Sequence, residues 1–432
     1  MLTLVILLFS VAVLAVLKNK ISPPHPSERL KVAQIIFSLG ALALVLGMIT
    51  QPKIVYQGAL TGLNLWWNIV FPSLLPFFIV SEILLSLGIV NFMGVLLEPV
   101  MRPLFNVPGT GSFVLAVGYT SGYPIGAMIT ARLRSQRLCT RLEAERLMAF
   151  TNNSSPLFML VAVSVGMFNN PQLGPVIAIA HYTANLTLGF LLRFYGRRDP
   201  ETIHLPPARE SALKRAFTEM FAVYQKDRRT LGKILSDAVR NSVQNLLNIG
   251  GFILLFAVII QLLTAAGFIS YLAQKLSLVL TPLGFSDAVL PALASGLIEM
   301  TIGTKLASEA AAPLQQQVLT VSMILAWSGL SIHAQAASMI AETDIRILPF
   351  IFTRVAHAIL AAVYTYLLFN LLSPVARALA APELNELLPA FSLWPGLPLS
   401  LVIFGAVSLI LLLTALLFHV GAGFRLILFR IR

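Results

Sequence analysis

The chain has 432 residues, of which 57% are hydrophobic and only 11% charged, and its mean hydropathy is +0.84. Soluble globular domains carry about 25% charged residues, so the composition excludes a soluble domain and favours a polytopic α-helical membrane protein. The apolar runs are long and do not alternate with polar residues, which excludes a transmembrane β-barrel. The net charge of +12 lies mostly in short segments between apolar runs, so it indicates cytoplasmic loops and no nucleic-acid partner.

Residues 1–53 are expected to form two N-terminal transmembrane helices. Lys18 and Lys20 follow the first apolar run, and cytoplasmic loops are the ones enriched in Lys and Arg. This charge order places the N-terminus outside and argues against a cleaved signal peptide. Residues 54–65 are short and mixed in polarity, which predicts a separate interfacial helix before the next span.

Residues 54–195 are predicted to form a first repeat. It contains GYTSGYPIG at 118–126 and TNNSSP at 151–156, where a simple span would carry Leu and Val. Non-helical backbone at membrane depth is tolerated only where protein buries it or a water-filled cavity borders it. Basic residues flank 112–134 on both sides, so we expect a re-entrant helical hairpin there, followed by an interrupted transmembrane helix.

A second repeat is predicted over 241–372, after a basic cytoplasmic linker at 196–240. Its hairpin is expected around GLIEMTIG at 296–303, and its interrupted helix contains WSGLSIH at 327–333. Segments interrupted by Gly and Pro at matching positions in two halves indicate a transporter's substrate site.

The two repeats align with an almost constant offset. Gly118 and Gly296 are 178 residues apart, and Ser154 and Ser331 are 177 apart. The first repeat begins outside and the second inside, so the predicted repeats have inverted topology, with a site near the membrane midplane. Residues 373–432 are expected to form an extracytoplasmic loop, a last transmembrane helix and a basic cytoplasmic tail.

Glu299 and Arg354 are the ionisable residues that stand out inside apolar segments. Such residues are costly in a bilayer and mark functional sites by default. Glu299 could bind a solute, carry a coupling proton or cap a half-helix, and Arg354 could bind an anion or snorkel to the surface. The candidate solute-binding residues are polar or small residues at the predicted breaks: Ser121, Gly122, Asn152, Asn153, Ser154, Ser155, Glu299, Thr301, Ser328, Ser331, His333 and Arg354.

Signatures of enzymes are missing from the sequence. It contains no HExxH, no GxSxG, no P-loop and no Cys/His metal spacing, so we expect neither catalysis nor a cofactor. The expected partners are a small-molecule solute, the lipid bilayer and a coupling proton or sodium ion, and a homo-oligomer is left open. The alternative to a secondary transporter is a non-transporting membrane scaffold for envelope assembly.

Four segments carry a resemblance to a known family: NLWWNIVFPSLLPFFIVSE (64–82), GYTSGYPIGA (118–127), TRLEAERLMAFTNNSSPLF (140–158) and SGLIEMTIG (295–303). In these the chain resembles the sporulation integral membrane protein YlbJ family. Both halves are similar to the gate or nucleoside-recognition domains of concentrative nucleoside transporters and spore maturation proteins. The resemblance implies a role in spore formation and passage of dipicolinic acid across the outer forespore membrane, with a nucleoside-type transporter as the alternative.

Overall fold

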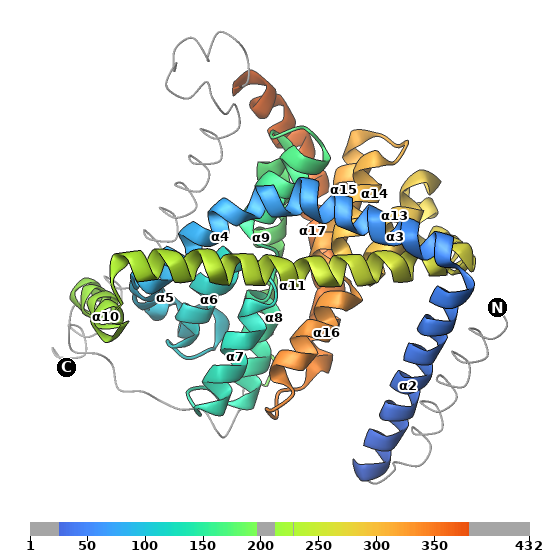
Figure 1. The fold of residues 1–432 in the computed structure, drawn as a ribbon. Helices are drawn as coiled ribbons and strands as arrows, with labels where there is room; N and C mark the ends of the chain where they lie inside the picture. Colours follow the sequence, from blue (N-terminus) through green and yellow to red (C-terminus); the bar gives the residue numbers. More distant parts are fainter. Residues whose placement is uncertain (1–25, 197–211, 228, 380–432) are drawn as a thin grey trace.

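The computed structural model describes residues 26–196, 212–227 and 229–379, and every regular element in these residues is a helix (Figure 1). The first described helix is α2 (Pro26–Thr50). Within this part of the chain, five helical stretches are long and apolar enough to cross a membrane: Pro52–Leu84, Leu173–Leu192, Leu231–Ala265, Leu314–Ile340 and Ile347–Phe369. The first predicted span, which ends before Lys18, and the last one, predicted within 373–432, fall among residues 1–25 and 380–432, outside the described residues.

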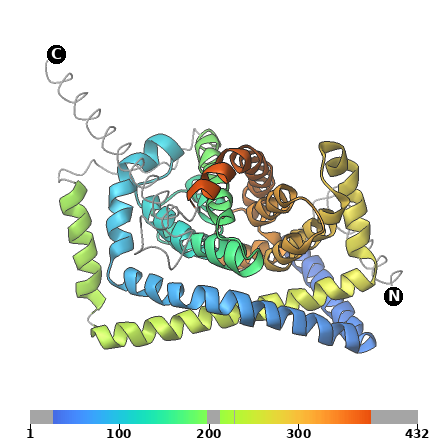
Figure 2. The same ribbon diagram turned by 90° about the horizontal axis from the view of Figure 1, so that it is seen from above.

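The predicted interfacial helix at 54–65 is wrong as a separate element. Helix α3 (Pro52–Leu65) continues through a π-helical turn, η1 (Trp66–Val70), into α4 (Phe71–Ser86). The two residues that follow α3 and η1, Trp66 and Phe71, have helical backbone angles, so the chain does not bend away. α11 (Leu231–Ala265) runs beside this continuous helix along one edge of the molecule (Figure 2).

Small residues allow the backbones of these two long helices to approach each other closely. A Cβ atom added at Gly62 would lie 2.9 Å from the Cβ of Ala257. A Cβ at Gly250 would lie 2.6 Å from the ring of Trp66, whose indole N–H donates to the carbonyl of Leu246 at 2.9 Å. The pair therefore forms a closely packed wall of two helices.

After each long helix the chain follows the same order of elements. Gly88 (φ 75°) and Gly267 (φ 78°) turn the chain in the left-handed region that favours glycine. The first series is α5 (Ile89–Phe105), α6 (Gly111–Ser121), α7 (Ile125–Ser135), α8 (Arg141–Thr151), η2 (Phe158–Met167) and α9 (Leu173–Leu192). The second series is α12 (Phe268–Leu280), the short turns η3 (Thr281–Leu283) and η4 (Asp287–Val289), α13 (Leu290–Ile298), α14 (Met300–Glu309), α15 (Leu314–Trp327), α16 (Gly329–Ile340) and α17 (Ile347–Leu379).

The predicted linker at 196–240 contains regular structure. α10 (Ala212–Asp227) packs against α5, with the rings of Phe92 and Phe217 at a centroid distance of 4.9 Å. The expected boundary between linker and second repeat, at residue 240, falls inside α11. The basic segment therefore includes the first three turns of a long helix.

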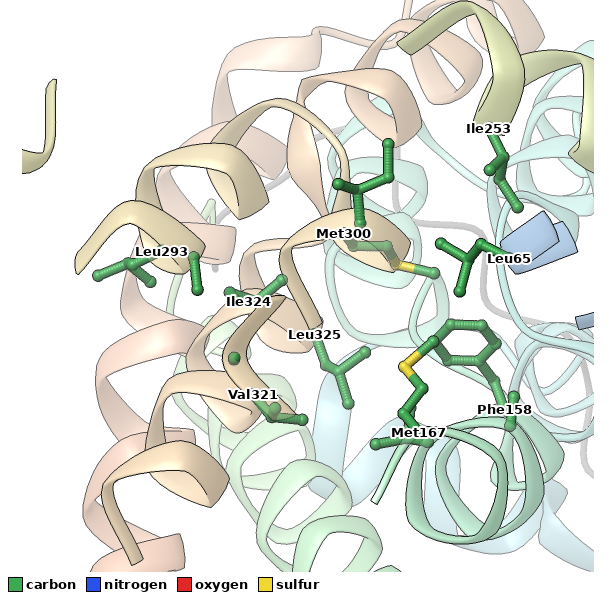
Figure 3. Packing of buried hydrophobic residues seen from close by; sticks show 14 of the residues in the cluster. Leu65, Phe158, Met167, Ile253, Leu293, Met300, Val321, Ile324 and Leu325 are labelled. Carbon is green, nitrogen blue, oxygen red and sulfur yellow. The ribbon is translucent and has the colours of Figure 1, made fainter. Parts of the chain in front are cut away.

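One apolar core joins the two series. Leu65 and Ile253 of the long helices meet Phe158 of η2, Met300 of α14 and Leu325 of α15 (Figure 3). All five are less than a tenth exposed. The two halves therefore share one core and do not fold as separate domains.

Two ion pairs connect α7 and α8 to the turn between α16 and α17. Arg134 donates to both carboxylate oxygens of Asp344 at 2.8 and 2.7 Å, and these hydrogen bonds lower the pKa of the Asp344 carboxyl. Arg346 donates to both oxygens of Glu145 at 2.7 and 2.9 Å. Bidentate pairing of this kind fixes orientation as well as distance, so the two series are joined at this end by geometry-specific contacts.

The packing of the two long helices predicts a difference between adjacent glycines. Gly250→Ala places a methyl group against the Trp66 ring, whereas a Cβ at Gly251 meets nothing within 4 Å. Overpacking costs about 1–3 kcal/mol, so the melting temperature in detergent should fall for Gly250→Ala and stay unchanged or rise for Gly251→Ala. Equal melting temperatures for both variants would contradict the close approach.

Candidate solute site

The first hairpin has its tip at Gly122, between α6 and α7. Gly122 has φ 78° and is followed by a cis peptide bond between Tyr123 and Pro124. A Cβ at Gly122 would lie 2.7 Å from the backbone nitrogen of Ser155. Only glycine therefore permits this contact between the hairpin tip and the non-helical segment at 152–155, which separates α8 from η2.

Side chains from α9 and α17 satisfy the carbonyls at the C-terminal end of α8. Arg354 donates from Nη1 to the carbonyl of Asn152 at 3.1 Å and from Nη2 to the carbonyl of Ala149. Asn185 donates to the carbonyl of Phe150 at 2.6 Å and accepts from Arg354 at 3.2 Å. A helix end leaves its last carbonyls unpaired, and here a guanidinium and an amide bind them.

The backbone of Ser154 is held from α9. Its N–H donates to Nε2 of His181 at 3.3 Å, and its carbonyl accepts from the hydroxyl of Tyr182 at 3.0 Å. His357 of α17 donates from Nε2 to the carbonyl of His181 at 2.9 Å. Since Nε2 of His181 accepts, its proton belongs on Nδ1. The two histidines therefore position the first helix break.

The second hairpin has its tip at Glu299, between α13 and α14. This residue is extended (φ −142°, ψ 124°), only 4% exposed, and its carboxylate accepts the backbone N–H of Ile302 at 2.8 Å as the N-cap of α14. Gly329, in the break between α15 and α16, would place a Cβ 3.0 Å from the nitrogen of Met300. Each hairpin tip thus packs against the helix break of its own half.

A cavity of about 70 Å³ lies between these breaks and the wall formed by α4 and α11. Its polar side brings together six predicted site residues: Ser121, Ser154, Ser155, Glu299, Thr301 and Ser331. Its apolar side includes Leu74 and Phe78 of α4 and Ile249 and Phe252 of α11. The cavity therefore has one polar side from the hairpins and breaks and one apolar side from the long helices.

The hydroxyls of Ser154 and Ser331 are buried in this lining and have no hydrogen-bond partner among the described residues. Ser154 lies in the first break, and Ser331 lies in the first turn of α16, directly after the second break. Buried polar atoms are paired in most proteins, so each unpaired one requires an explanation. A polar group held in the cavity would supply the missing partner for both hydroxyls.

The other predicted site residues do not line the cavity: Gly122, Asn152, Asn153, Ser328, His333 and Arg354. His333 is packed between the rings of Trp327 and Phe350, at centroid distances of 4.3 and 5.3 Å. Gly122, Asn152, Asn153 and Ser328 belong to the backbone turns themselves. These residues form or support the helix breaks and do not line the cavity.

Arg354 is fully buried within the protein, which contradicts the alternative in which it snorkels to the surface. Its guanidinium has no carboxylate partner among the described residues and is bonded to carbonyls, to Asn185 and, at 3.4 Å, to the hydroxyl of Tyr123. Tyr123 itself lines the cavity. The positive charge of Arg354 is therefore separated from the cavity by the side chain of Tyr123. Lys305 of α14 is paired with Glu309 at 2.9 Å.

The sequence reasoning missed two polar lining residues, Tyr123 and Gln335, and the apolar lining residues. Tyr123 directly follows Gly122, the predicted tip of the hairpin. Its position next to the predicted break could therefore have identified it as a lining residue. Gln335 lies two turns into α16 and has no such signal. Among the described residues, no three His, Cys, Asp or Glu side chains gather as a metal site would require.

These features define a polytopic α-helical integral membrane protein, and residues 68–180 match the family described as Gate: Nucleoside recognition. Over 335 residues the chain is 46% identical to the sporulation integral membrane protein YlbJ of Bacillus subtilis (strain 168), covering 76% of this chain and 81% of that protein. The chain belongs to the YlbJ family of sporulation integral membrane proteins.

Other similarities are more distant. An uncharacterized protein of Alkalihalophilus pseudofirmus is 29% identical over 129 residues, which cover 29% of this chain and 28% of that protein. The structure of CNTnw in an inward-facing substrate-bound state matches with a TM-score of 0.45 at 12% identity, covering 76% of this chain and 87% of that one. A doubly substituted CNTnw in an outward-facing state gives a TM-score of 0.40 at 10% identity over the same shares.

The contacts of Arg354 predict that charge alone cannot replace it. Arg354→Lys keeps the charge but cannot reproduce a fork that reaches Ala149, Asn152 and Asn185 together. Leaving buried partners unpaired costs about 1–3 kcal/mol each, so the melting temperature in detergent should fall clearly. Arg240→Lys, at an exposed position of α11, is the control and should melt as the wild type does. A wild-type melting temperature for Arg354→Lys would contradict this role.

Proposed function

We propose that the protein is a secondary transporter and that the cavity between the two helix breaks is its solute site. The observation that carries this proposal is the pair of unpartnered hydroxyls, Ser154 and Ser331, beside the buried carboxyl of Glu299. A non-transporting scaffold would have no use for a polar cavity among membrane-crossing helices, since buried polar groups without partners are costly.

The proposed architecture is a pair of inverted repeats, each with a re-entrant hairpin and an interrupted transmembrane helix. The repeated order of elements after α4 and after α11 supports it. With this topology the N-terminus lies outside, the C-terminus and the segment 196–240 are cytoplasmic, and the site is near the midplane.

The proposed solute is a small, planar, aromatic anion, for which dipicolinic acid is the specific candidate. Four aromatic rings line the cavity, those of Phe78, Tyr123, Phe158 and Phe252. Arg354 provides a buried positive charge behind Tyr123, and such a charge attracts anions strongly because little water screens it. Membership of a sporulation family supports transport of this solute across the outer forespore membrane. A nucleoside, which the gate description suggests, is the alternative.

Glu299 is proposed to carry a coupling proton. Its carboxyl lies in the same cavity as the anion would. Two negative charges in one poorly solvated site disfavour each other, so binding of a dianion favours the protonated acid. The protonated carboxyl would then donate a hydrogen bond to the solute, and solute and proton would move together.

The cavity must widen for loading. A volume of about 70 Å³ corresponds to roughly two waters at about 30 Å³ each, whereas sites for small molecules measure about 300–1,000 Å³. The apolar side comes from the wall of α4 and α11, and the polar side comes from the hairpins and breaks. We therefore propose that the wall and the hairpins separate when the solute enters.

Transport is tested by uptake into proteoliposomes, with labelled dipicolinate and a labelled nucleoside compared. We expect dipicolinate uptake by the wild type and its loss, by at least about tenfold, in Glu299→Gln, because the proton carrier is removed. Glu309→Gln is the matched control, since Glu309 is 57% exposed and paired with Lys305 on one helix. Nucleoside uptake without dipicolinate uptake would show that the solute is a nucleoside. Uptake of neither compound would favour the non-transporting scaffold.

The proposed topology is tested by cysteine labelling in cells. Arg215→Cys is introduced in a Cys139→Ser background, because Cys139 is the only cysteine in the sequence. A membrane-impermeant maleimide should label position 215 only after the membrane is opened. Labelling of intact cells would contradict the cytoplasmic placement of this segment and the inverted repeats with it.

A further inference from the structure

Helix α10 is held where the apolar part of α4 ends. Arg229, two residues after α10, donates to the hydroxyl of Ser86, the last residue of α4, at 3.4 Å. The outer face of α4 just before this point is apolar, with Val80 52% and Leu84 40% exposed. α11, a candidate membrane span, begins at Leu231. The three residues between α10 and α11 reach at most about 10 Å, so α10 lies next to the N-terminal end of α11.

α10 packs on α5 with one face and leaves an apolar stripe beside it open. Ala216 is buried, and Met220 lies against the turn at Gly88. The open stripe consists of Leu213, Phe217 and Phe221, which recur every four residues and are 53%, 44% and 53% exposed. Residues at this spacing share one face of a helix. The ring of Phe217 contacts Phe92 of α5, and its side chain is still 44% exposed.

The remaining face of α10 is polar and begins at Lys214 and Arg215. The surrounding segment, residues 193–240, contains eleven Lys and Arg against six Asp and Glu. A helix with an apolar face, a charged face and basic flanks is typical of helices that lie in the plane of a membrane interface. Each basic residue near an anionic surface contributes about 1 kcal/mol of attraction.

We propose that α10 lies in the headgroup layer of the bilayer, with Leu213, Phe217 and Phe221 among the acyl chains and the basic flank against anionic phospholipid. The occupant of the open stripe is therefore the lipid leaflet itself. α10 packs against α5 and α4 and lies near the start of α11 (Figures 1 and 2). The lipid contact therefore anchors the wall of the cavity to the membrane surface.

Depth is measured on the full-length protein in liposomes of phosphatidylcholine and phosphatidylglycerol. A nitroxide is attached at Phe221→Cys or at Glu219→Cys, both in the Cys139→Ser background. We expect the label at 221 to collide mainly with oxygen and the label at 219, on the polar face, mainly with a water-soluble nickel chelate. Nickel-dominated collisions at both positions would overturn the proposal. Shielding of position 221 from both reagents would also overturn it, because protein and not lipid would then cover the stripe.

The anionic lipid is tested with the label at 221 in pure phosphatidylcholine and in the variant Lys214→Gln, Arg215→Gln. We expect nickel accessibility to rise at least about fivefold in either case, because the loss of about 1 kcal/mol for a single basic residue already corresponds to this factor. Unchanged accessibility in both would overturn the role of anionic lipid. Neither outcome depends on transport, so a failure here is distinguishable from a failure of the proposed solute.

Discussion

The structure depends on one constraint, which is that backbone polar groups released by a helix break inside a membrane must find partners. Each unpaired group costs several kcal/mol in hydrocarbon. At the first break the partners are side chains from two other helices: Arg354, Asn185, His181 and Tyr182 converge on the backbone of residues 149–154. This explains why polar and charged residues stand in the middle of α9 and α17, and it fixes both helices around α8.

The same constraint separates the residues that bind the backbone of the breaks from the residues that are available to a solute in the cavity. Both Nη groups of Arg354 are hydrogen-bonded to the helix break and its neighbours, and the residue does not line the cavity, so it acts on a solute only through its charge. The hydroxyls of Ser154 and Ser331 and the carboxyl of Glu299 remain in the cavity lining. The apolar wall of α4 and α11 adds no polar partners there, so recognition of a polar solute is left to the hairpin tips and the breaks.

Sequence reasoning located the breaks because GYTSGYPIG, TNNSSP, GLIEMTIG and WSGLSIH place Gly, Ser and Asn where a span requires apolar residues. It could not assign a role to Arg354, because a lone arginine in an apolar segment gives the same sequence pattern whether its side chain binds backbone or solute. The continuous helix from α3 to α4 was missed because a π-helical turn has no clear sequence signal. The start of α11 was missed because the charge of 193–240 masked its periodicity.

The central claim is that the two breaks together bind the solute, and equilibrium binding of radiolabelled dipicolinate to the purified protein tests it most directly. The double variant Ser154→Ala, Ser331→Ala removes both unpartnered hydroxyls of the cavity. Ser242→Ala is the control, because it removes an equally buried and unpartnered hydroxyl from α11 outside the cavity. Two lost hydrogen bonds of about 0.5–1.5 kcal/mol each predict an affinity at least about fivefold weaker in the double variant and unchanged in the control. Wild-type affinity in the double variant would contradict the account.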